Sequence, residues 1–170
     1  MSKASISKSK TQPHTTGPET KVCKTCGISK DINCFEKSKG YRIRQCRPCR
    51  QAGKRKRMSE SPYAYIGNLY HGLAYRRKET HDFTITKEDL HELYDQQKGI
   101  CAYSGVEMTN IKDGEGYHLT NISIDRVNND LGYVKGNIAL VCLSVNMMKY
   151  TMELKDLIKW CKLIAKHNED

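Results

Sequence analysis

The sequence contains no long hydrophobic run and no apolar leader. No stretch of 18 apolar residues occurs in its 170 residues, so a membrane-spanning helix is not expected. The first 20 residues are mostly Ser, Thr, Lys and Pro, and they lack the apolar region of a secretory signal. We therefore expect a cytoplasmic, intracellular protein with no membrane partner, and a disordered tail over residues 1–20.

Apolar residues are also few, at 38% of the chain, while charged residues make up 28%. This composition allows one modest hydrophobic core but not a large one. The eight cysteines, in a chain expected inside the cell, are predicted to be reduced thiols and metal ligands and not a disulfide scaffold.

Positive charge is concentrated in one part of the sequence. The net charge is +10, and residues 21–79 carry 16 Lys and Arg against four Asp and Glu, whereas residues 80–170 carry 10 against 14. A basic half joined to an acidic half is typical of a protein that grips a polyanion with one part and holds metal with the other. A merely solvated basic surface is the alternative.

Four of the cysteines form two CxxC pairs separated by 19 residues: Cys23, Cys26, Cys46 and Cys49. Each pair offers two thiolates at a spacing that chelates one ion, and Gly27 allows a tight turn after the first pair. Four thiolates suit tetrahedral Zn²⁺, and a segment this short needs the metal to fold. The sequence predicts one structural zinc site within a module spanning residues 21–57.

Basic residues surround and follow this module. Ten of them are expected to contact nucleic-acid phosphates: Arg42, Arg44, Arg47, Arg50, Lys54, Arg55, Lys56, Arg57, Arg76 and Arg77. The run Lys54–Arg57 is also compatible with a nuclear localisation signal. We favour phosphate contact for this run.

Residues 58–98 are expected to form a helical connector. Ser61 followed by Pro62 predicts a helix start, and the helix continues to about Lys78 despite two glycines. Thr86 and Asp89 have the spacing of a capping box, which predicts a second helix through about Gln97.

Residues 123–149 have the pattern strand, turn, strand, helix. Residues 123–127 and 138–141 are β-type, the Asn, Asp and Gly residues between them form a turn, and Asn146 opens a helix. Such a unit can bring three polar positions together: Tyr133 or Lys135 after the turn, Asp125 on the first strand and Asn146 on the helix. The carboxylate of Asp125 and the amide oxygen of Asn146 suit Mg²⁺ or Mn²⁺, and Arg126 can clamp a phosphate.

This stretch resembles the ββα-metal core of HNH (His-Me finger) endonucleases, in the variant that carries Asp-Arg where most members carry Asp-His. A rare-cutting restriction enzyme and many phage nucleases share this variant. The matching residues are Asp125, Arg126, Gly132, Tyr133, Asn137, Val141, Cys142, Asn146 and Lys149. The resemblance implies that Asp125 and Asn146 hold a catalytic Mg²⁺ or Mn²⁺, and that Arg126 and Lys149 bind phosphate. Asn137 is expected to orient the hairpin or to aid the metal geometry.

The general base that usually follows the Asp is absent. In the Asp-Arg variant a tyrosine placed like Tyr133 does this work, and a phenol, which titrates near pH 10, needs a nearby cation for that role. His118 is the other candidate, because an imidazole titrates near neutral pH.

Two of the other cysteines mark a second zinc site that is expected to be lost. Many HNH proteins carry CxxC pairs at the places where this chain has Cys101-x-x-Ser104 and Cys142-x-x-Val145. Valine cannot bind a metal ion and serine is a poor zinc ligand, so apolar packing is expected there.

The sequence thus predicts a small α+β protein: a tail (residues 1–20), a four-cysteine zinc module (21–57), a helical connector (58–98) and an HNH-like nuclease core with a C-terminal helix (99–170). The resemblance to HNH endonucleases implies a divalent-metal-dependent endonuclease of restriction, homing or phage type that acts on double-stranded DNA. The alternatives are an inactive DNA-binding protein with a relic core, and a junction or RNA nuclease. Cutting both strands would require a homodimer, because one such site cuts one strand.

Overall fold

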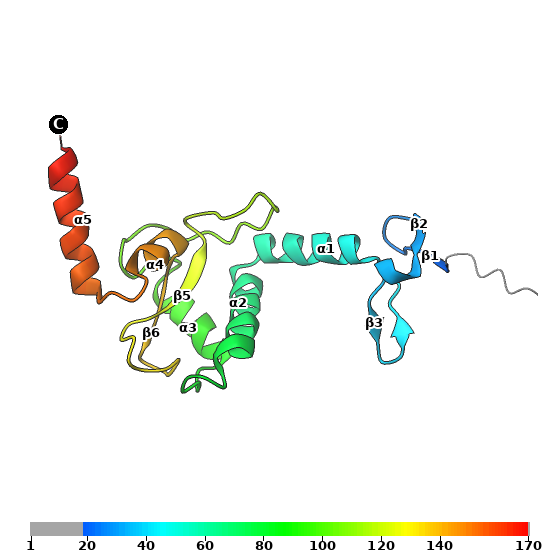
Figure 1. Cartoon of the computed structure of the whole chain (residues 1–170), viewed down its shortest axis with the longest axis horizontal. Helices are drawn as coiled ribbons and strands as arrows, with labels where there is room; N and C mark the ends of the chain where they lie inside the picture. Colours follow the sequence, from blue (N-terminus) through cyan, green and yellow to red (C-terminus); the bar gives the residue numbers. More distant parts are fainter. Residues whose placement is uncertain (1–18, 170) are drawn as a thin grey trace, which may run out of the picture. The chain divides into compact units, whose positions relative to one another are not determined.

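The computed structural model describes residues 19–169, which form two compact units divided between Ala52 and Gly53 (Figure 1). The tail expected over residues 1–20 lies outside the described residues, except for its last two. Thr20 begins the first strand.

The first unit, residues 19–52, is built from two short antiparallel hairpins. Strand β1 (Thr20–Val22) pairs with β2 (Ser29–Asp31), and β3 (Lys37–Ser38) pairs with β4 (Tyr41–Arg42) after the 3-10 turn η1 (Ile32–Cys34). Its buried apolar cluster consists of Cys23, Phe35 and Cys46 only. Such a core is too small to fold the unit without further stabilisation.

Helix α1 (Arg47–Glu60) starts in the first unit and ends in the second. It carries the basic run that the sequence places after the cysteines. Its residues are mostly Arg, Lys, Gln and Ala, which are good helix formers. Met58 is its buried residue, so the helix lacks the apolar stripe by which helices are recognised in a sequence.

The second unit begins with the two helices that the sequence predicts. Helix α2 (Pro62–Arg77) has Ser61 as its N-cap, whose side chain accepts a hydrogen bond from the N–H of Ala64 (3.3 Å). Helix α3 (Lys87–Gln96) has the complete capping box of Thr86 and Asp89. Both helix predictions are confirmed.

The centre of the second unit is an antiparallel hairpin followed directly by a helix. Strand β5 (Ile122–Arg126) pairs with β6 (Ile138–Cys142), with Asp125 opposite Ala139. Helix α4 (Leu143–Lys149) follows without a loop and begins three residues earlier than predicted. Helix α5 (Leu154–Asn168) ends the described chain.

The main core lies between this hairpin and helices α2 and α3. Fully buried side chains from all of them meet there, among them Ile66, Leu90, Ile122 and Leu140. Helices and small hairpins thus occur together, which confirms the α+β class. Among residues 19–169 no helix has both the length and the apolar character needed to cross a membrane.

Candidate functional site

The four cysteines of the first unit converge on one point. Their Sγ atoms all lie within 4.8 Å of one another. A turn closes around the first pair: Gly27 has φ +69° and donates its N–H to the carbonyl of Cys23 (2.9 Å). The second pair straddles the start of α1, where Cys46 donates its N–H to the Sγ of Cys23 (3.3 Å).

The sulfur chemistry of this cluster fits a metal ion. Hydrogen bonds from the backbone, first from Cys46, lower the pKa of the Cys23 thiol to about 5. The neighbouring sulfurs, Cys46 first, raise the pKa of Cys49 to about 12. Four thiolates held this close therefore need a cation to compensate their charge, and the four cysteines could hold one metal ion.

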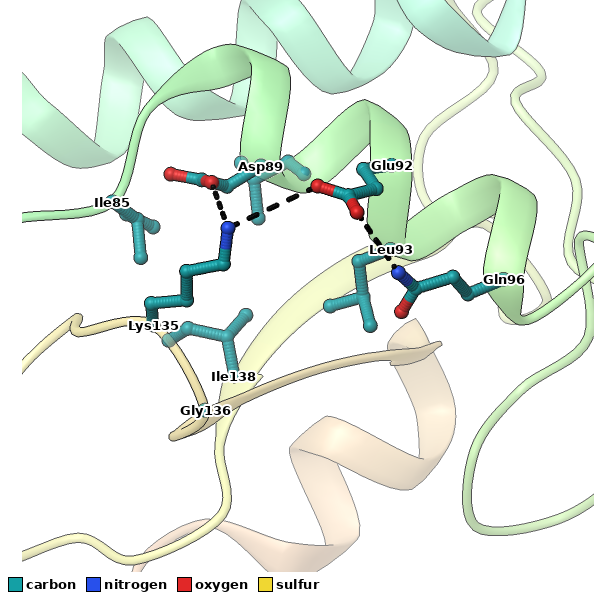
Figure 2. A pocket seen from close by; sticks show the side chains of 9 residues that line it. Ile85, Asp89, Glu92, Leu93, Gln96, Lys135, Gly136 and Ile138 are labelled. Atoms are coloured by element: carbon teal, nitrogen blue, oxygen red, sulfur yellow. Dashed lines mark hydrogen bonds and ion pairs between the residues drawn. The ribbon is translucent and has the colours of Figure 1, made fainter.

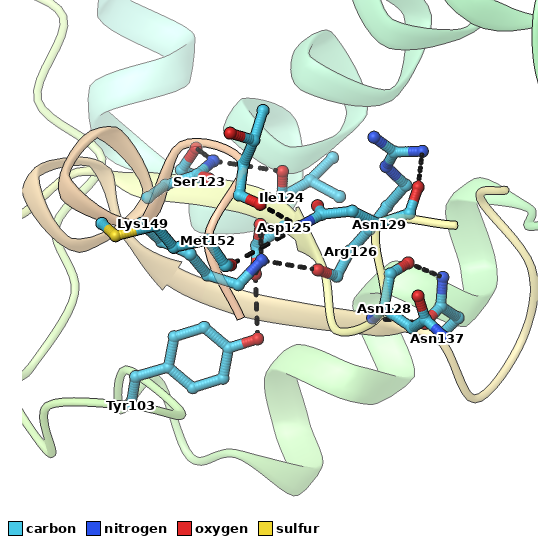
Figure 3. Close-up of polar contacts among 12 residues, drawn as sticks. Tyr103, Ser123, Ile124, Asp125, Arg126, Asn128, Asn129, Asn137, Lys149 and Met152 are labelled. Atoms are coloured by element: carbon cyan, nitrogen blue, oxygen red, sulfur yellow. Dashed lines mark hydrogen bonds and ion pairs between the residues drawn. The ribbon is translucent and has the colours of Figure 1, made fainter. Parts of the chain in front are cut away.

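In the second unit, Asp125 lies at the centre of a buried polar cluster (Figure 3). It projects from β5 on the same face as Ser123, because alternate residues of a strand share a face. Its carboxylate accepts hydrogen bonds from the hydroxyl of Tyr103 (2.9 Å) and from the ammonium group of Lys149 (3.1 and 3.3 Å). Asp125 is 5% exposed and Lys149 is fully buried, so this is a desolvated ion pair.

Lys149 reaches Asp125 from the last turn of α4, and its Nζ also donates to the carbonyl of Arg126 (3.0 Å). The lysine therefore lies against the carboxylate and not at the surface, where a phosphate would first be met. Tyr103 closes the other side of the cluster. Burial, followed by the hydrogen bond to Asp125, raises the pKa of the Tyr103 phenol above its ordinary value, so the phenol stays a proton donor.

Asn146 faces the same strand from α4. Its Nδ2 donates to the Oγ of Ser123 (2.7 Å) and to the carbonyl of Ile124 (3.3 Å). Both amide hydrogens are thus engaged, and its Oδ1 accepts no hydrogen bond within the described chain. An amide oxygen and a carboxylate are the hard donors that Mg²⁺ and Mn²⁺ prefer, so the residues present fit a divalent cation.

Arg126 and Tyr133 lie outside the buried polar cluster around Asp125. Arg126 is the next residue along β5, and its Nη1 donates to the carbonyls of Asn129 and Leu131 (both 3.0 Å). Its guanidinium lies 5.3 Å from the ring centroid of Tyr133, which is 8% exposed. The arginine therefore braces the hairpin turn and lines an open polar depression beside it.

This depression contains a histidine that the sequence analysis did not single out. His81 comes from the α2–α3 loop, and its ring centroid is 5.8 Å from that of Tyr133. The loop is fixed by the N–H of Tyr133, which donates to the carbonyl of Asp82 (2.7 Å). His81 was overlooked because 45 residues separate it from Arg126, and no local motif joins them. Tyr103 was overlooked for the same reason.

Asn137 ties the hairpin turn together. Its Oδ1 accepts from the N–H of Asn128 (2.9 Å), and its Nδ2 donates to the carbonyls of Asn128 (3.0 Å) and Gly132 (2.9 Å). The expectation that it orients the hairpin is confirmed.

His118 is engaged elsewhere. Its Nε2 pairs with the carboxylate of Asp113 (3.0 Å), and this hydrogen bond lowers the pKa of Asp113 to about 2. The structure places this pair in the loop between Ile111 and Thr120.

Several of the predicted phosphate-binding arginines make contacts within the first unit. Arg42 donates to the carbonyl of Phe35 (2.8 Å) and to the side chain of Asn33 (2.9 Å), and Arg47 donates to the carbonyl of Asn33 (3.3 Å). Arg50 forms an ion pair with Glu36. Arg44 instead lines an open depression of this unit.

The remaining predicted phosphate ligands lie on helices. Lys54, Arg55, Lys56 and Arg57 belong to α1, where Lys56 pairs with Glu60 (3.7 Å). Arg76 and Arg77 form the exposed last turn of α2, where cations are favoured by the helix dipole.

Cys101 and Cys142 lie together in the main core, both 2% exposed, and the N–H of Cys142 donates to the Sγ of Cys101 (3.2 Å). Val145 packs against the same core. The two thiols therefore pack as small core side chains.

A smaller hollow of about 260 Å³ lies between α3 and the start of β6 (Figure 2). Apolar side chains such as Ile85 and Leu93 line it. Lys135 crosses its rim to Asp89 (3.0 Å) and Glu92 (3.9 Å).

Comparison with known proteins gives the following relatives. No known family profile matches the sequence. The chain is 31% identical over 97 residues to an uncharacterized 29.0 kDa protein of Enterobacteria phage T4, and 30% identical over 86 residues to an uncharacterized protein of Acanthamoeba polyphaga mimivirus. These alignments cover 57% and 51% of this chain but only 36% and 14% of the relatives. The chain thus spans about a third of the length of the phage protein and less of the viral one.

Among solved structures, the chain is similar to the rare-cutting HNH restriction endonuclease PacI. The TM-score is 0.43 at 20% sequence identity, over 86% of this chain and 94% of that one.

Proposed function

We propose that the protein is a divalent-metal-dependent DNA endonuclease of the HNH type. The observation that carries the proposal is the β5–β6–α4 unit. In it α4 contacts β5 through two side chains: Lys149 bonds Asp125, and Asn146 bonds Ser123. The order strand, strand, helix is the one that the sequence resemblance implies for a ββα-metal core. The four-cysteine cluster would hold a structural Zn²⁺.

In this proposal Asp125 and Asn146 are the ligands of the catalytic Mg²⁺ or Mn²⁺. The ion, when bound, supplies Lewis-acid polarisation of the scissile phosphate and compensates charge on the leaving oxygen. Tyr103 and Lys149 hold the Asp125 carboxylate in one orientation through their hydrogen bonds. Asn146 is oriented by Ser123, so that its amide oxygen stays free of protein donors within the described chain.

Phosphate binding is assigned to Arg126, whose guanidinium lines the polar depression beside the hairpin. The guanidinium of Arg126 also lies over the ring of Tyr133, 5.3 Å from its centroid. His81 shares this depression, and His118 pairs with Asp113 outside it. Activation of water is assigned to Tyr133 on the family resemblance, with His81 and His118 as the groups to be tested beside it.

A second candidate is a DNA-binding protein that does not cut. The observation in its favour is the buried pair of Asp125 and Lys149, in which an ammonium group already neutralises the carboxylate that a metal ion would use. A junction-selective or RNA nuclease would use the same residues on another substrate.

The test is cleavage of supercoiled plasmid by the zinc-loaded protein with Mg²⁺ or Mn²⁺ added or omitted. Omission is preferred to EDTA, because a chelator also competes for the four cysteines. Cleavage that requires the added metal supports the proposal, and linear rather than nicked product would indicate a dimer. Binding without cleavage, with every metal and with branched DNA and RNA also tried, would favour the second candidate.

A further inference from the structure

A groove of about 540 Å³ lies between α1, α2 and α3 in the second unit, and nothing above assigns it a role. We call it the three-helix groove. It is lined by side chains at one-turn spacing on each helix: Lys54 and Arg57 on α1, Ala64, Asn68 and His71 on α2, and Lys87 and His91 on α3. Residues three or four apart lie on one face of a helix, so each helix turns one face to the groove.

The lining of the three-helix groove is cationic. It contains three permanent cations and two histidines, and none of its lining residues is acidic. Two carboxylates contact lining residues: Asp95 accepts a hydrogen bond from the hydroxyl of Tyr63 (2.6 Å), and Glu88 lies 3.2 Å from the ammonium group of Lys87. The Glu88 side chain is 74% exposed, and so exposed a pair contributes little. The groove therefore attracts an anion.

A glycine lies among the lining residues of the groove. Gly67 is buried in the middle of α2, where glycine costs about 1 kcal/mol relative to alanine. A Cβ at this position would meet the Lys87 side chain at 3.5 Å, an ordinary contact, so packing alone does not require glycine. The aliphatic stem of Lys87 therefore packs directly against α2 at this point.

The walls of the groove are held by the core. Next to Arg57, Met58 is 5% exposed, and its carbonyl accepts a hydrogen bond from the side chain of Asn110 (2.6 Å). The Nε2 of His91 donates to the carbonyl of Tyr63 (3.1 Å). The cations are therefore presented by fixed helices, which lowers the entropy lost when a ligand binds.

We propose that the three-helix groove holds the phosphate backbone of double-stranded DNA. The choice of DNA as the anion rests on the proposed function, whereas the presence of an anion site rests on the groove itself. Lys54, Arg57 and Lys87 contact the phosphates, with Asn68 and His71 as further donors. Because these are phosphate contacts, the groove adds affinity and register to binding without reading sequence.

The test compares two triple variants that remove equal charge. One carries Lys54→Gln, Arg57→Gln and Lys87→Gln; the control carries Lys155→Gln, Lys159→Gln and Lys162→Gln, all exposed on α5 and outside the groove. Duplex DNA binding is measured by fluorescence anisotropy over a salt series without divalent metal. The slope of log K against log salt is negative, and each lost phosphate contact makes it shallower by about 0.9. We therefore expect the groove triple to make it shallower by roughly 2 to 3. The control should leave the slope nearly unchanged.

A second pair of variants tests the groove without removing any cation. Ala64→Glu and Ala64→Gln add side chains of the same size to the lining, and both are good helix formers. We expect Ala64→Glu to bind DNA at least fivefold more weakly than Ala64→Gln, because only the former brings a negative charge into the groove.

Equal effects of the groove triple and its control, or equal binding by the two Ala64 variants, would overturn the proposal. So would a groove triple that binds DNA normally but loses binding of pyrophosphate, which would indicate a small-anion site. Failure of this proposal can be told apart from failure of the proposed function. If the groove triple cuts plasmid and binds DNA like the wild type, the groove proposal fails and the nuclease proposal stands. If the wild type never cuts but the groove triple loses DNA binding, the nuclease proposal fails and the groove proposal stands.

Discussion

At the scale of single residues, the second unit depends on a few buried polar contacts around Asp125. The carboxylate is desolvated, and its charge is compensated by Lys149 and by the hydroxyl of Tyr103. Asp125 and Lys149 were singled out from the sequence because they fall on the motif. Tyr103 was not, because it is 22 residues from Asp125 and only the folded chain brings it near.

Replacing Lys149 by methionine tests the buried ion pair. The variant leaves the Asp125 carboxylate without its cation, and breaking a buried pair in this way costs about 3–5 kcal/mol of unfolding free energy. The measurement is urea unfolding at neutral pH. The double variant Lys149→Met with Asp125→Asn should recover part of this loss, because no uncompensated charge then remains. A single variant as stable as the wild type would show that the pair is not formed.

Replacing Tyr103 by phenylalanine tests its role in orienting Asp125. The ring remains, but the hydrogen bond to the carboxylate is lost. Removing a group that supports a metal ligand typically costs 10- to 100-fold in metal affinity or activity. We expect plasmid cleavage to need at least tenfold more Mn²⁺, with DNA affinity unchanged. Tyr94→Phe is the matched control; equal metal dependence in the two variants would refute the role.

At the scale of elements, the sequence predicted most of the second unit. The β5–β6–α4 order, α2 and α3 follow from strand alternation, from the Asn- and Gly-rich turn and from caps at Ser61 and Thr86. Helix α1 could not be predicted in this way, because it buries only Met58 and most of its remaining residues are charged or polar. Asp125 and Arg126 are consecutive residues of β5, so their side chains point to opposite faces of the strand. The motif alone does not show this separation.

The capping box of α3 makes a pH-dependent contribution to stability. The N–H of Thr86, then its hydroxyl and Lys135, lower the pKa of Asp89 to about 2 from an ordinary value of 3.8. Because the folded-state pKa is the lower one, the contribution is complete above about pH 4 and is lost as the pH falls towards 2.

We therefore expect Asp89→Ala to lower the melting temperature at pH 7, with the difference from wild type closing as the pH falls from 4 to 2. Glu92→Ala, on the same helix but outside the cap, is the control. A difference that stays constant down to pH 2 would contradict the assignment.

At the scale of the whole molecule, the two units differ in what holds them together. The second has a continuous apolar core, whereas the buried cluster of the first consists of Phe35 and two of the four clustered cysteines. Metal-binding free energy is folding free energy in so small a module. The two candidate sites are divided in the same way, because the four clustered cysteines lie in one unit and the Asp125 cluster in the other.

Removing the metal should therefore unfold one unit and leave the other. We expect a zinc chelator, or Cys46→Ser, to abolish amide-exchange protection in residues 20–50 while protection of β5 and β6 persists. Cys161→Ser, on α5, is the control for loss of a thiol. Uniform loss of protection across both units would show that they fold as one.

The most direct measurement is the initial rate of plasmid cleavage by Asp125→Asn and Asn146→Ala beside Asp156→Asn, with folding of each checked by circular dichroism. Asp156 lies in the exposed first turn of α5, so its variant removes the same charge as Asp125→Asn without touching the site. We expect both site variants to lose at least 100-fold in rate while Asp156→Asn cuts like the wild type. Folded Asp125→Asn and Asn146→Ala proteins that cut at the wild-type rate would contradict the placement of the catalytic metal on β5 and α4.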